Sequence, residues 1–221
     1  MLKEEIQIPI NHFSLGASLV IPENIKALVI FSHGSGSSRF SPRNNYVAGV
    51  LNGHGIATLL SDLLTRQEDM NYDNRFNISL LSKRLVIVTG WALQQEELRD
   101  LPVGYFGAST GGASALNAAV LLKDQITAVV SRGGRPDLAK DVLPQVQAAT
   151  LLIVGSLDNQ VIQLNQLAYD MLACKKHMHI IQGASHLFEE SGKLEEVAQL
   201  AVNWFMENLI QPHLIKQKEI H

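Results

Sequence analysis

The sequence has few of the features that mark secreted, metal-binding or membrane proteins. Its 221 residues include one cysteine, Cys174, so neither an internal disulfide nor a cysteine-rich metal site can form. No apolar run approaches the ~20 residues of a transmembrane helix. The first residues, MLKEEIQIPI, lack the long apolar core of a signal peptide. We therefore expect a cytoplasmic protein with no membrane partner.

Charge imbalance and nucleotide-binding motifs are also missing. Lys and Arg number 18 against 21 Asp and Glu, and the net charge of −3 gives no sign of nucleic-acid binding. Neither Gly-Lys-Ser/Thr nor G-x-G-x-x-G occurs, which excludes a P-loop and argues against a dinucleotide site. We expect no nucleic-acid partner, no metal and no organic cofactor, and the oligomeric state is not readable.

What the sequence does contain is a regular alternation of strand and helix patterns, in a chain that is 46% hydrophobic. An alternating pattern predicts an edge hairpin, and short unbroken apolar runs predict strands covered on both faces. The strands are expected at 3–10, 16–21, 27–32, 56–60, 103–106, 128–131, 150–154 and 177–181. The helices are expected from about 42, over 78–98, after 109, over 161–172 and over 193–208, with a loop at 63–77, a short helix or loop to about 147, and a frayed tail at 210–221. The pattern predicts one α/β domain over 1–221, with a doubly wound, mostly parallel sheet flanked by helices and no large cap domain.

The chain is organised around the run Gly107-Ala108-Ser109-Thr110-Gly111, which joins an apolar strand to an Ala- and Leu-rich helix. A serine between small residues in this context is typical of a nucleophile elbow. Larger side chains at Gly107 and Gly111 would collide across so sharp a turn. The helix N-terminus would favour negative charge that develops beside Ser109. The alternative is a glycine-rich turn with an idle serine.

A nucleophilic serine needs a base, and the base needs an acid that orients it. Asp158 and His186 each follow a predicted strand, in the chain order Ser, Asp, His. Because the carboxyl ends of parallel strands meet at one edge of a sheet, we expect these three residues to come together. Asp137 also follows a strand and is an alternative acid, whereas His177 and His179 lie within a predicted strand.

An oxyanion hole requires two N–H groups aimed at the reacting oxygen. We expect one from the backbone of Thr110, the residue after the serine. The other is expected from the loop HGSGSS after strand 27–32, with Ser35 preferred and Gly36 second. His33 is expected to brace this loop.

Loops at the same sheet edge carry further candidates for substrate contact. The arginines could clamp a carboxylate or phosphate, or could be structural groups paired with Asp62 or Asp137. They are Arg39, Arg43, Arg132 and Arg135. The loop 63–77 is expected to shape the rim of the site, with Tyr72 and Phe76 either lining an acyl pocket or packing in an ordinary way.

With these motifs in order, the chain resembles an α/β-hydrolase, and its size and lack of a cap resemble the dienelactone hydrolase group. The stretches SHGSGSSRFSPRN, GASTGGASAL and SRGGRPDLA also resemble hydrolase halves that occur fused to phosphoribosyltransferase-like domains. Dienelactone hydrolases proper use a cysteine nucleophile, and this chain has Ser109, so their lactone substrate is not carried over. The resemblance implies a serine hydrolase of ester-like bonds.

The sequence thus predicts a serine hydrolase with the triad Ser109, Asp158 and His186. Its substrate is expected to be a small carboxylic ester, thioester or lactone, with an anionic substrate as one reading of the arginines. Two alternatives stay open. One is acyl transfer to an acceptor other than water. The other is a non-catalytic module that binds an anionic ligand.

Overall fold

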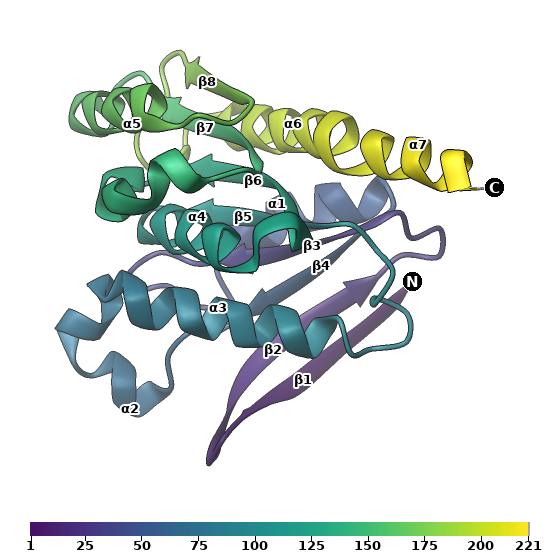
Figure 1. Cartoon of the computed structure of the whole chain (residues 1–221). Helices are drawn as coiled ribbons and strands as arrows, with labels where there is room; N and C mark the ends of the chain where they lie inside the picture. The colour runs from purple at the N-terminus through teal and green to yellow at the C-terminus, as the bar shows by residue number, and fades with distance from the viewer. Residues whose placement is uncertain (221) are drawn as a thin grey trace.

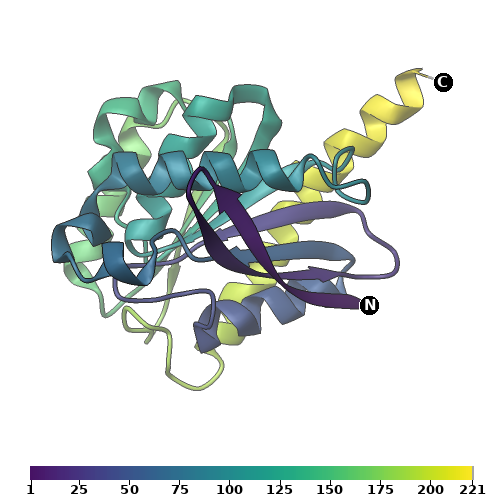
Figure 2. The same cartoon turned by 90° about the horizontal axis from the view of Figure 1, so that it is seen from below.

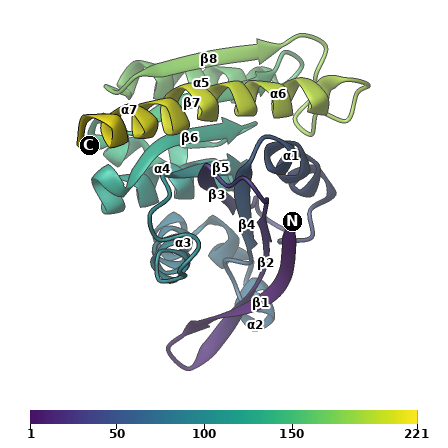
Figure 3. The same ribbon diagram turned by 90° about the vertical axis from the view of Figure 1, so that its right-hand side faces the viewer.

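Within the described part of the chain, eight strands form one mixed sheet with a parallel centre and an antiparallel edge. The computed structural model describes the backbone of residues 1–220 and the side chains of residues 1–215. The strand order is β1-β2-β4-β3-β5-β6-β7-β8, with β2 antiparallel to β1 and to β4 and the other pairs parallel (Figure 3). The strands are β1 (Leu2–Ile10), β2 (Phe13–Ile21), β3 (Ala27–Ser32), β4 (Ile56–Ser61), β5 (Val103–Ala108), β6 (Ile126–Arg132), β7 (Ala149–Gly155) and β8 (Lys176–Ile181).

Helices cover both faces of this sheet (Figure 1). Helices α1 and α6 lie on one face, and α3, α4 and α5 lie on the other. The helices are α1 (Pro42–Gly53), α2 (Arg66–Asp69), α3 (Ile78–Ala92), α4 (Thr110–Leu122), α5 (Asn159–Met171), α6 (Lys193–Phe205) and α7 (Gln211–Ile220). Short 3₁₀ segments are η1 (Tyr72–Phe76), η2 (Lys123–Gln125) and η3 (Pro136–Gln145), and a π-helical segment, η4 (Met206–Ile210), joins α6 to α7.

The core explains why the central strands read as unbroken apolar runs. In β3, Leu28 and Ile30 pack with α3 and α4, whereas Val29 and Phe31 pack with α1 and α6. All six residues of β3 are buried. A strand covered on both faces buries every side chain, so it shows no alternation in its sequence. This sheet with helices on both faces is the predicted fold class.

Three segments differ from the sequence prediction. The loop 63–77 contains α2 and η1, because Thr65 and Glu68 form a capping box that starts a short helix. Helix α3 ends at Ala92 rather than near 98, and turns then bury Leu98 against the core. The tail predicted over 210–221 is helical from Gln211 to Ile220, and α7 continues the direction of α6 past the sheet (Figure 2). His221 lies outside the described residues.

The sheet order fixes where a ligand site can form. From β3 the chain continues to β4 on one side, and β5 returns on the other side of β3. Loops that leave neighbouring parallel strands in opposite directions open a crevice at the carboxyl ends of those strands. In the register of β3 and β5, Ser32 pairs with Gly107. The loop that begins at His33 therefore lies beside the turn at Ser109.

Candidate active site

Ser109 occupies a strained turn between β5 and α4. Its φ of 52° is positive, which is uncommon for a residue other than glycine. The surrounding backbone holds this conformation, because the Ser109 N–H donates to the Arg132 carbonyl at 3.2 Å. The Ser109 carbonyl accepts from the N–H groups of Gly112 and Arg135, each at 3.0 Å. Such strain persists where neighbouring structure over-determines it, and it concentrates at functional sites.

Glycines allow the turn to pack this tightly. A Cβ on Gly107 would lie 2.5 Å from the Gly111 carbonyl oxygen, and one on Gly111 would lie 2.0 Å from the Ser32 carbonyl oxygen. A Cβ on Gly34 would lie 3.0 Å from the Ser109 Cβ, so the loop after β3 also approaches the serine closely. The predicted collision across the turn is found at Gly107, whereas a Cβ on Gly111 would collide with the end of β3.

His186 and Asp158 meet at the same edge of the sheet. Asp158 follows β7 at the start of α5, and His186 lies in the loop after β8. The His186 Nδ1 donates to the Asp158 Oδ2 at 2.5 Å. An ionised carboxylate can only accept, so the hydrogen of this bond is on the His186 Nδ1. The other ring nitrogen, Nε2, is then the one that can carry a free lone pair. The Asp158 side chain is 16% exposed and that of His186 39%, so the imidazole is open to solvent on one side.

Ser109 and His186 line the same cavity, which has a volume of about 200 Å³. The loop after β3 and the start of α1 also line it. The remaining lining residues are Gly34, Ser35, Ser37, Ser41, Arg43, Asn44, Ala108, Arg132 and Leu187. This volume is below the roughly 300 Å³ at which pockets for drug-sized ligands begin, so it suits a small substrate.

The loop after β3 is held by hydrogen bonds on both sides. The Ser35 N–H, the preferred second oxyanion donor, instead donates to the Thr110 Oγ1 at 2.9 Å. The hydroxyl of Thr110 at the start of α4 faces the loop and captures this N–H. The His33 Nδ1 hydrogen-bonds the Gly34 carbonyl at 3.0 Å, and the His33 Nε2 accepts from the Leu63 N–H at 3.2 Å.

His33 is therefore a brace, as predicted. Both ring nitrogens are engaged, and the ring is buried in a way that lowers the pKa of His33 below its ordinary value of 6.5. In the neutral form, Nδ1 donates and Nε2 accepts. Protonation would place a second hydrogen opposite the Leu63 N–H and break that contact.

The four predicted loop arginines separate into two kinds. Arg39 pairs with Asp62 and Glu5, and Arg135 donates two hydrogen bonds to Asp137 at 2.8 and 2.9 Å. These are the structural pairings that the sequence left open, and neither side chain lines the cavity at Ser109. Arg43 and Arg132 do line it: Arg43 pairs with Glu189 at 2.7 Å, and Arg132 donates to the Asn44 amide oxygen at 3.3 Å.

The other candidates do not line the cavity at Ser109. The Asp137 carboxylate is held by Arg135, and His179 lies in β8 with its Nε2 3.6 Å from Glu196. Tyr72 and Phe76 stack on each other with ring centroids 5.1 Å apart, and neither lines the cavity. The side chains described, through residue 215, include no cluster of three His, Cys, Asp or Glu suited to a metal. Over the same part of the chain, no helix has the length and apolar character needed to span a bilayer.

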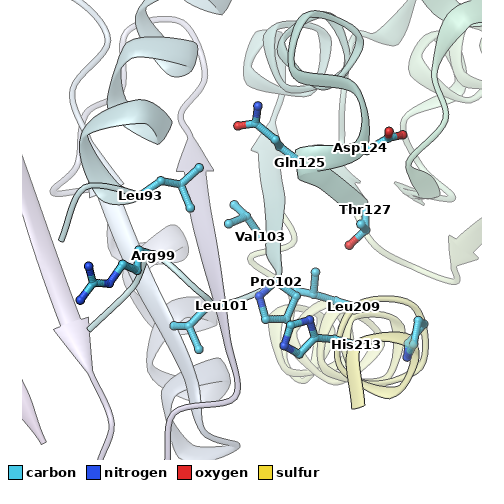
Figure 4. A pocket seen from close by; sticks show the side chains of 11 residues that line it. Leu93, Arg99, Leu101, Pro102, Val103, Asp124, Gln125, Thr127, Leu209 and His213 are labelled. Atoms are coloured by element: carbon cyan, nitrogen blue, oxygen red, sulfur yellow. The ribbon is translucent and has the colours of Figure 1, made fainter. Parts of the chain in front are cut away.

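A larger cavity of about 330 Å³ lies at the opposite edge of the sheet (Figure 4). Val103 at the start of β5 and Thr127 near the start of β6 line it, together with Leu209 from η4. Ser109, Asp158 and His186 are at the carboxyl ends of their strands and take no part in it. The cavity at Ser109, although smaller, is lined by both Ser109 and His186.

Comparison with known proteins gives the family. No family model matches the chain. The structure of a dienelactone hydrolase from Anabaena variabilis is 50% identical, with a TM-score of 0.91, and the alignment covers 94% of this chain and 98% of that one. The chain belongs to the dienelactone hydrolase family. Est1E from Butyrivibrio proteoclasticus shares the fold at 16% identity, with a TM-score of 0.76 over 92% of this chain and 98% of that one.

A longer relative of this dienelactone hydrolase-family chain occurs in Mycobacterium tuberculosis. That protein is named as a phosphoribosyl transferase and is 52% identical over 209 residues, or 95% of this chain. The chain spans about half the length, 47%, of this curated relative.

Some residues that shape the site of this family member were missed by the sequence prediction. A Cβ on Gly155 would lie 2.3 Å from the Ala184 carbonyl oxygen, so this glycine lets the end of β7 approach the His186 loop. Phe188 is buried with a φ of 57°, and its ring centroid lies 5.9 Å from the Arg132 Cζ. Gly155 directly follows a predicted strand and could have been suspected, whereas no local signal marks Phe188 as strained.

Proposed function

We propose that this protein is a serine hydrolase that cleaves small carboxylic esters, thioesters or lactones through an acyl-enzyme on Ser109. One observation carries the proposal: Ser109 shares its cavity with His186, whose Nδ1 is bonded to Asp158 at 2.5 Å. A nucleophile, a base and an orienting acid on three different strand ends form the arrangement that acyl-transfer chemistry requires. The family relationship supports hydrolysis as the reaction class.

In the proposed mechanism, the Ser109 Oγ attacks the carbonyl carbon while its proton passes to the His186 Nε2. Asp158 holds the ring with Nδ1 protonated and stabilises the imidazolium that forms. The tetrahedral intermediate then collapses, and His186 protonates the leaving oxygen or sulfur. A water molecule, deprotonated by His186, attacks the acyl-enzyme and regenerates Ser109.

The oxyanion is assigned to backbone donors on both sides of Ser109. The Thr110 N–H, in the first turn of α4, is one donor, and the helix N-terminus adds favourable potential. The loop after β3 supplies the second. The Ser35 N–H would exchange the Thr110 hydroxyl for the substrate oxygen, and the Gly36 N–H is the alternative.

The direct test is labelling with a fluorophosphonate, which reacts with activated serines. Wild type should be labelled at one site, Ser109→Ala should not be labelled, and Ser191→Ala, which alters an exposed serine, should behave as wild type. Equal labelling of wild type and Ser109→Ala would refute the mechanism. Failure of folded wild type to react or to hydrolyse any ester in a broad panel would favour a binding module.

The acid is tested by a matched pair of variants. Asp158→Asn should lower kcat for ester hydrolysis by about 100- to 10,000-fold, because His186 loses its orienting charge. Asp137→Asn removes a half-exposed ion pair with Arg135 and should change kcat less than about 3-fold. The reverse order of effects would assign the acid to Asp137. Product analysis with added alcohol would separate hydrolysis from acyl transfer.

A further inference from the structure

Arg132 is a buried cation in the cavity that holds Ser109. It ends β6, is 6% exposed, and lines the cavity together with His186. Its side-chain Nη2 donates to a neutral group, the Asn44 amide oxygen, at 3.3 Å. Among the side chains that the structure describes, its buried Nε has no hydrogen-bond partner and no carboxylate pairs with it.

A buried guanidinium such as that of Arg132 is unfavourable unless it pairs with an anion. Buried charges in proteins are normally paired, because desolvation of an isolated ion is expensive. Burial, followed by repulsion from Arg43, lowers the pKa of Arg132 to about 10. The guanidinium therefore stays charged at neutral pH.

Arg43 is the second cation on the cavity wall. Its Nε is buried and, within the described part of the chain, unpartnered. Its Nη1 donates to Glu189 at 2.7 Å, and the Glu189 side chain is 61% exposed. An exposed ion pair of this kind contributes little and exchanges readily. Glu189 does not itself line the cavity, so its carboxylate holds Arg43 from outside and can be displaced.

We propose that Arg132 and Arg43 form an anion subsite within the Ser109 cavity, which Glu189 partly satisfies until a substrate carboxylate or phosphate takes its place. This inference rests on the proposed function for the position of the scissile bond. The substrate class it names is a small ester or thioester that carries an anionic group. A guanidinium fork suits both carboxylate and phosphate.

The contrast with the other two loop arginines supports this assignment. Arg39 and Arg135 each have an aspartate, and both lie outside the cavity. Arg132 is more deeply buried than either and has none. Ser109, Arg43 and Arg132 line one cavity of about 200 Å³, a volume that suits a small acyl group.

The first experiment measures selectivity with matched substrates. Monoethyl glutarate and ethyl pentanoate have the same chain length and differ in the terminal carboxylate. We expect wild type to prefer the anionic ester in kcat/KM. Arg132→Gln and Arg43→Gln should each lower the anionic-to-neutral ratio by about 10- to 100-fold, the range of a lost hydrogen bond to a charged group. Arg135→Gln is the matched control and should keep the wild-type ratio.

The variant Glu189→Gln tests whether the Glu189 carboxylate competes with the substrate anion for Arg43. Its expected effect on selectivity is opposite to that of the arginine variants. Removing the competitor should raise kcat/KM for the anionic ester by about 2- to 5-fold relative to the neutral one. The subsite would be overturned if wild type showed an anionic-to-neutral kcat/KM ratio near one. It would also be overturned if the Arg132 and Arg43 variants kept the wild-type ratio while they still reacted with fluorophosphonate. A fall in the ratio of Glu189→Gln would overturn the competitor role.

A binding measurement separates this inference from the proposed reaction. Glutarate and inorganic phosphate are titrated into Ser109→Ala and Ser109→Ala/Arg132→Gln by calorimetry. Binding that requires Arg132 supports the subsite even if the hydrolysis proposal fails, and the tighter ligand identifies the anion. No binding of either anion to Ser109→Ala, although the protein is folded, overturns the subsite whatever the activity of wild type.

Discussion

Gly111→Ala is the sharpest single perturbation of the turn that holds Ser109. The added Cβ would lie 2.0 Å from the Ser32 carbonyl oxygen, 2.7 Å from the Ser32 carbonyl carbon and 2.8 Å from the His33 carbonyl oxygen. All three are backbone atoms, so no side-chain rotation can relieve the contact. The end of β3 and the start of α4 must separate by about 1 Å before the closest contact reaches 3.0 Å.

Two effects compete in the free energy of unfolding. Alanine is favoured over glycine in a helix by about 0.8–1.0 kcal/mol. Overpacking in a rigid environment costs about 1–3 kcal/mol, and contact with backbone alone puts Gly111 at the upper end. We expect a net loss of about 1–2 kcal/mol, which for a chain of this length lowers Tm by about 2–8 °C. A displacement of about 1 Å at the nucleophile should also slow fluorophosphonate labelling by about 100-fold.

Gly90→Ala supplies the matched control. Gly90 lies on the exposed face of α3, and a Cβ there would meet no atom within 4 Å. The helix preference then acts without opposition, so Tm should rise by up to about 4 °C with no change in labelling. Thermal unfolding and labelling kinetics on both variants complete the assay. If Gly111→Ala unfolds at or above the wild-type temperature and labels at the wild-type rate, the close packing of β3 against α4 does not position Ser109.

Two further predictions concern the loop after β3. Because burial lowers the pKa of His33, the unfolded chain binds its proton more readily, and the free energy of unfolding falls as the pH drops below about 6.5. His33→Gln removes this pH-dependent part of the free energy of unfolding, so its Tm should fall less than that of wild type between about pH 7 and pH 5. Parallel Tm curves of the two proteins would contradict the conclusion that His33 is buried as a neutral ring. Thr110→Val removes the acceptor of the Ser35 N–H, so the loop after β3 should become less ordered. The kcat for ester hydrolysis should then fall by about 2- to 10-fold. An unchanged kcat would mean that this hydrogen bond does not order the loop.

The sequence was most informative where a chemical role coincides with a strand end. Ser109, Asp158 and His186 each follow an apolar run, and parallel strands bring such positions to one edge whatever the details of packing. The strand positions were predictable for the same reason, because a strand buried on both faces leaves an unbroken apolar signature. Helix ends were harder: Leu98 is buried by a turn beyond α3, and its apolar character resembled another helical turn.

The roles of the arginines and of the loop after β3 were decided only by tertiary structure. Four arginines in loops looked equivalent in the sequence. Asp62 and Glu189, both remote in the sequence, pair with Arg39 and Arg43, and the adjacent Asp137 pairs with Arg135. Among the described side chains, no carboxylate pairs with Arg132, whose hydrogen bond goes to Asn44. The Ser35 N–H was likewise engaged by a hydroxyl 75 residues away.

What the sequence by itself determined is the fold class, the chain order of the three proposed catalytic residues and the need for glycine on both sides of Ser109. These follow from local rules: hydrophobic periodicity, strand-end position and the space that a sharp turn leaves. The tertiary structure alone decided which charges are neutralised and which N–H groups are already bonded. Ion pairs and side-chain hydrogen bonds depend on distances between segments that are remote in sequence. Arg132 lines the Ser109 cavity without a carboxylate partner among the described side chains only once those segments have packed.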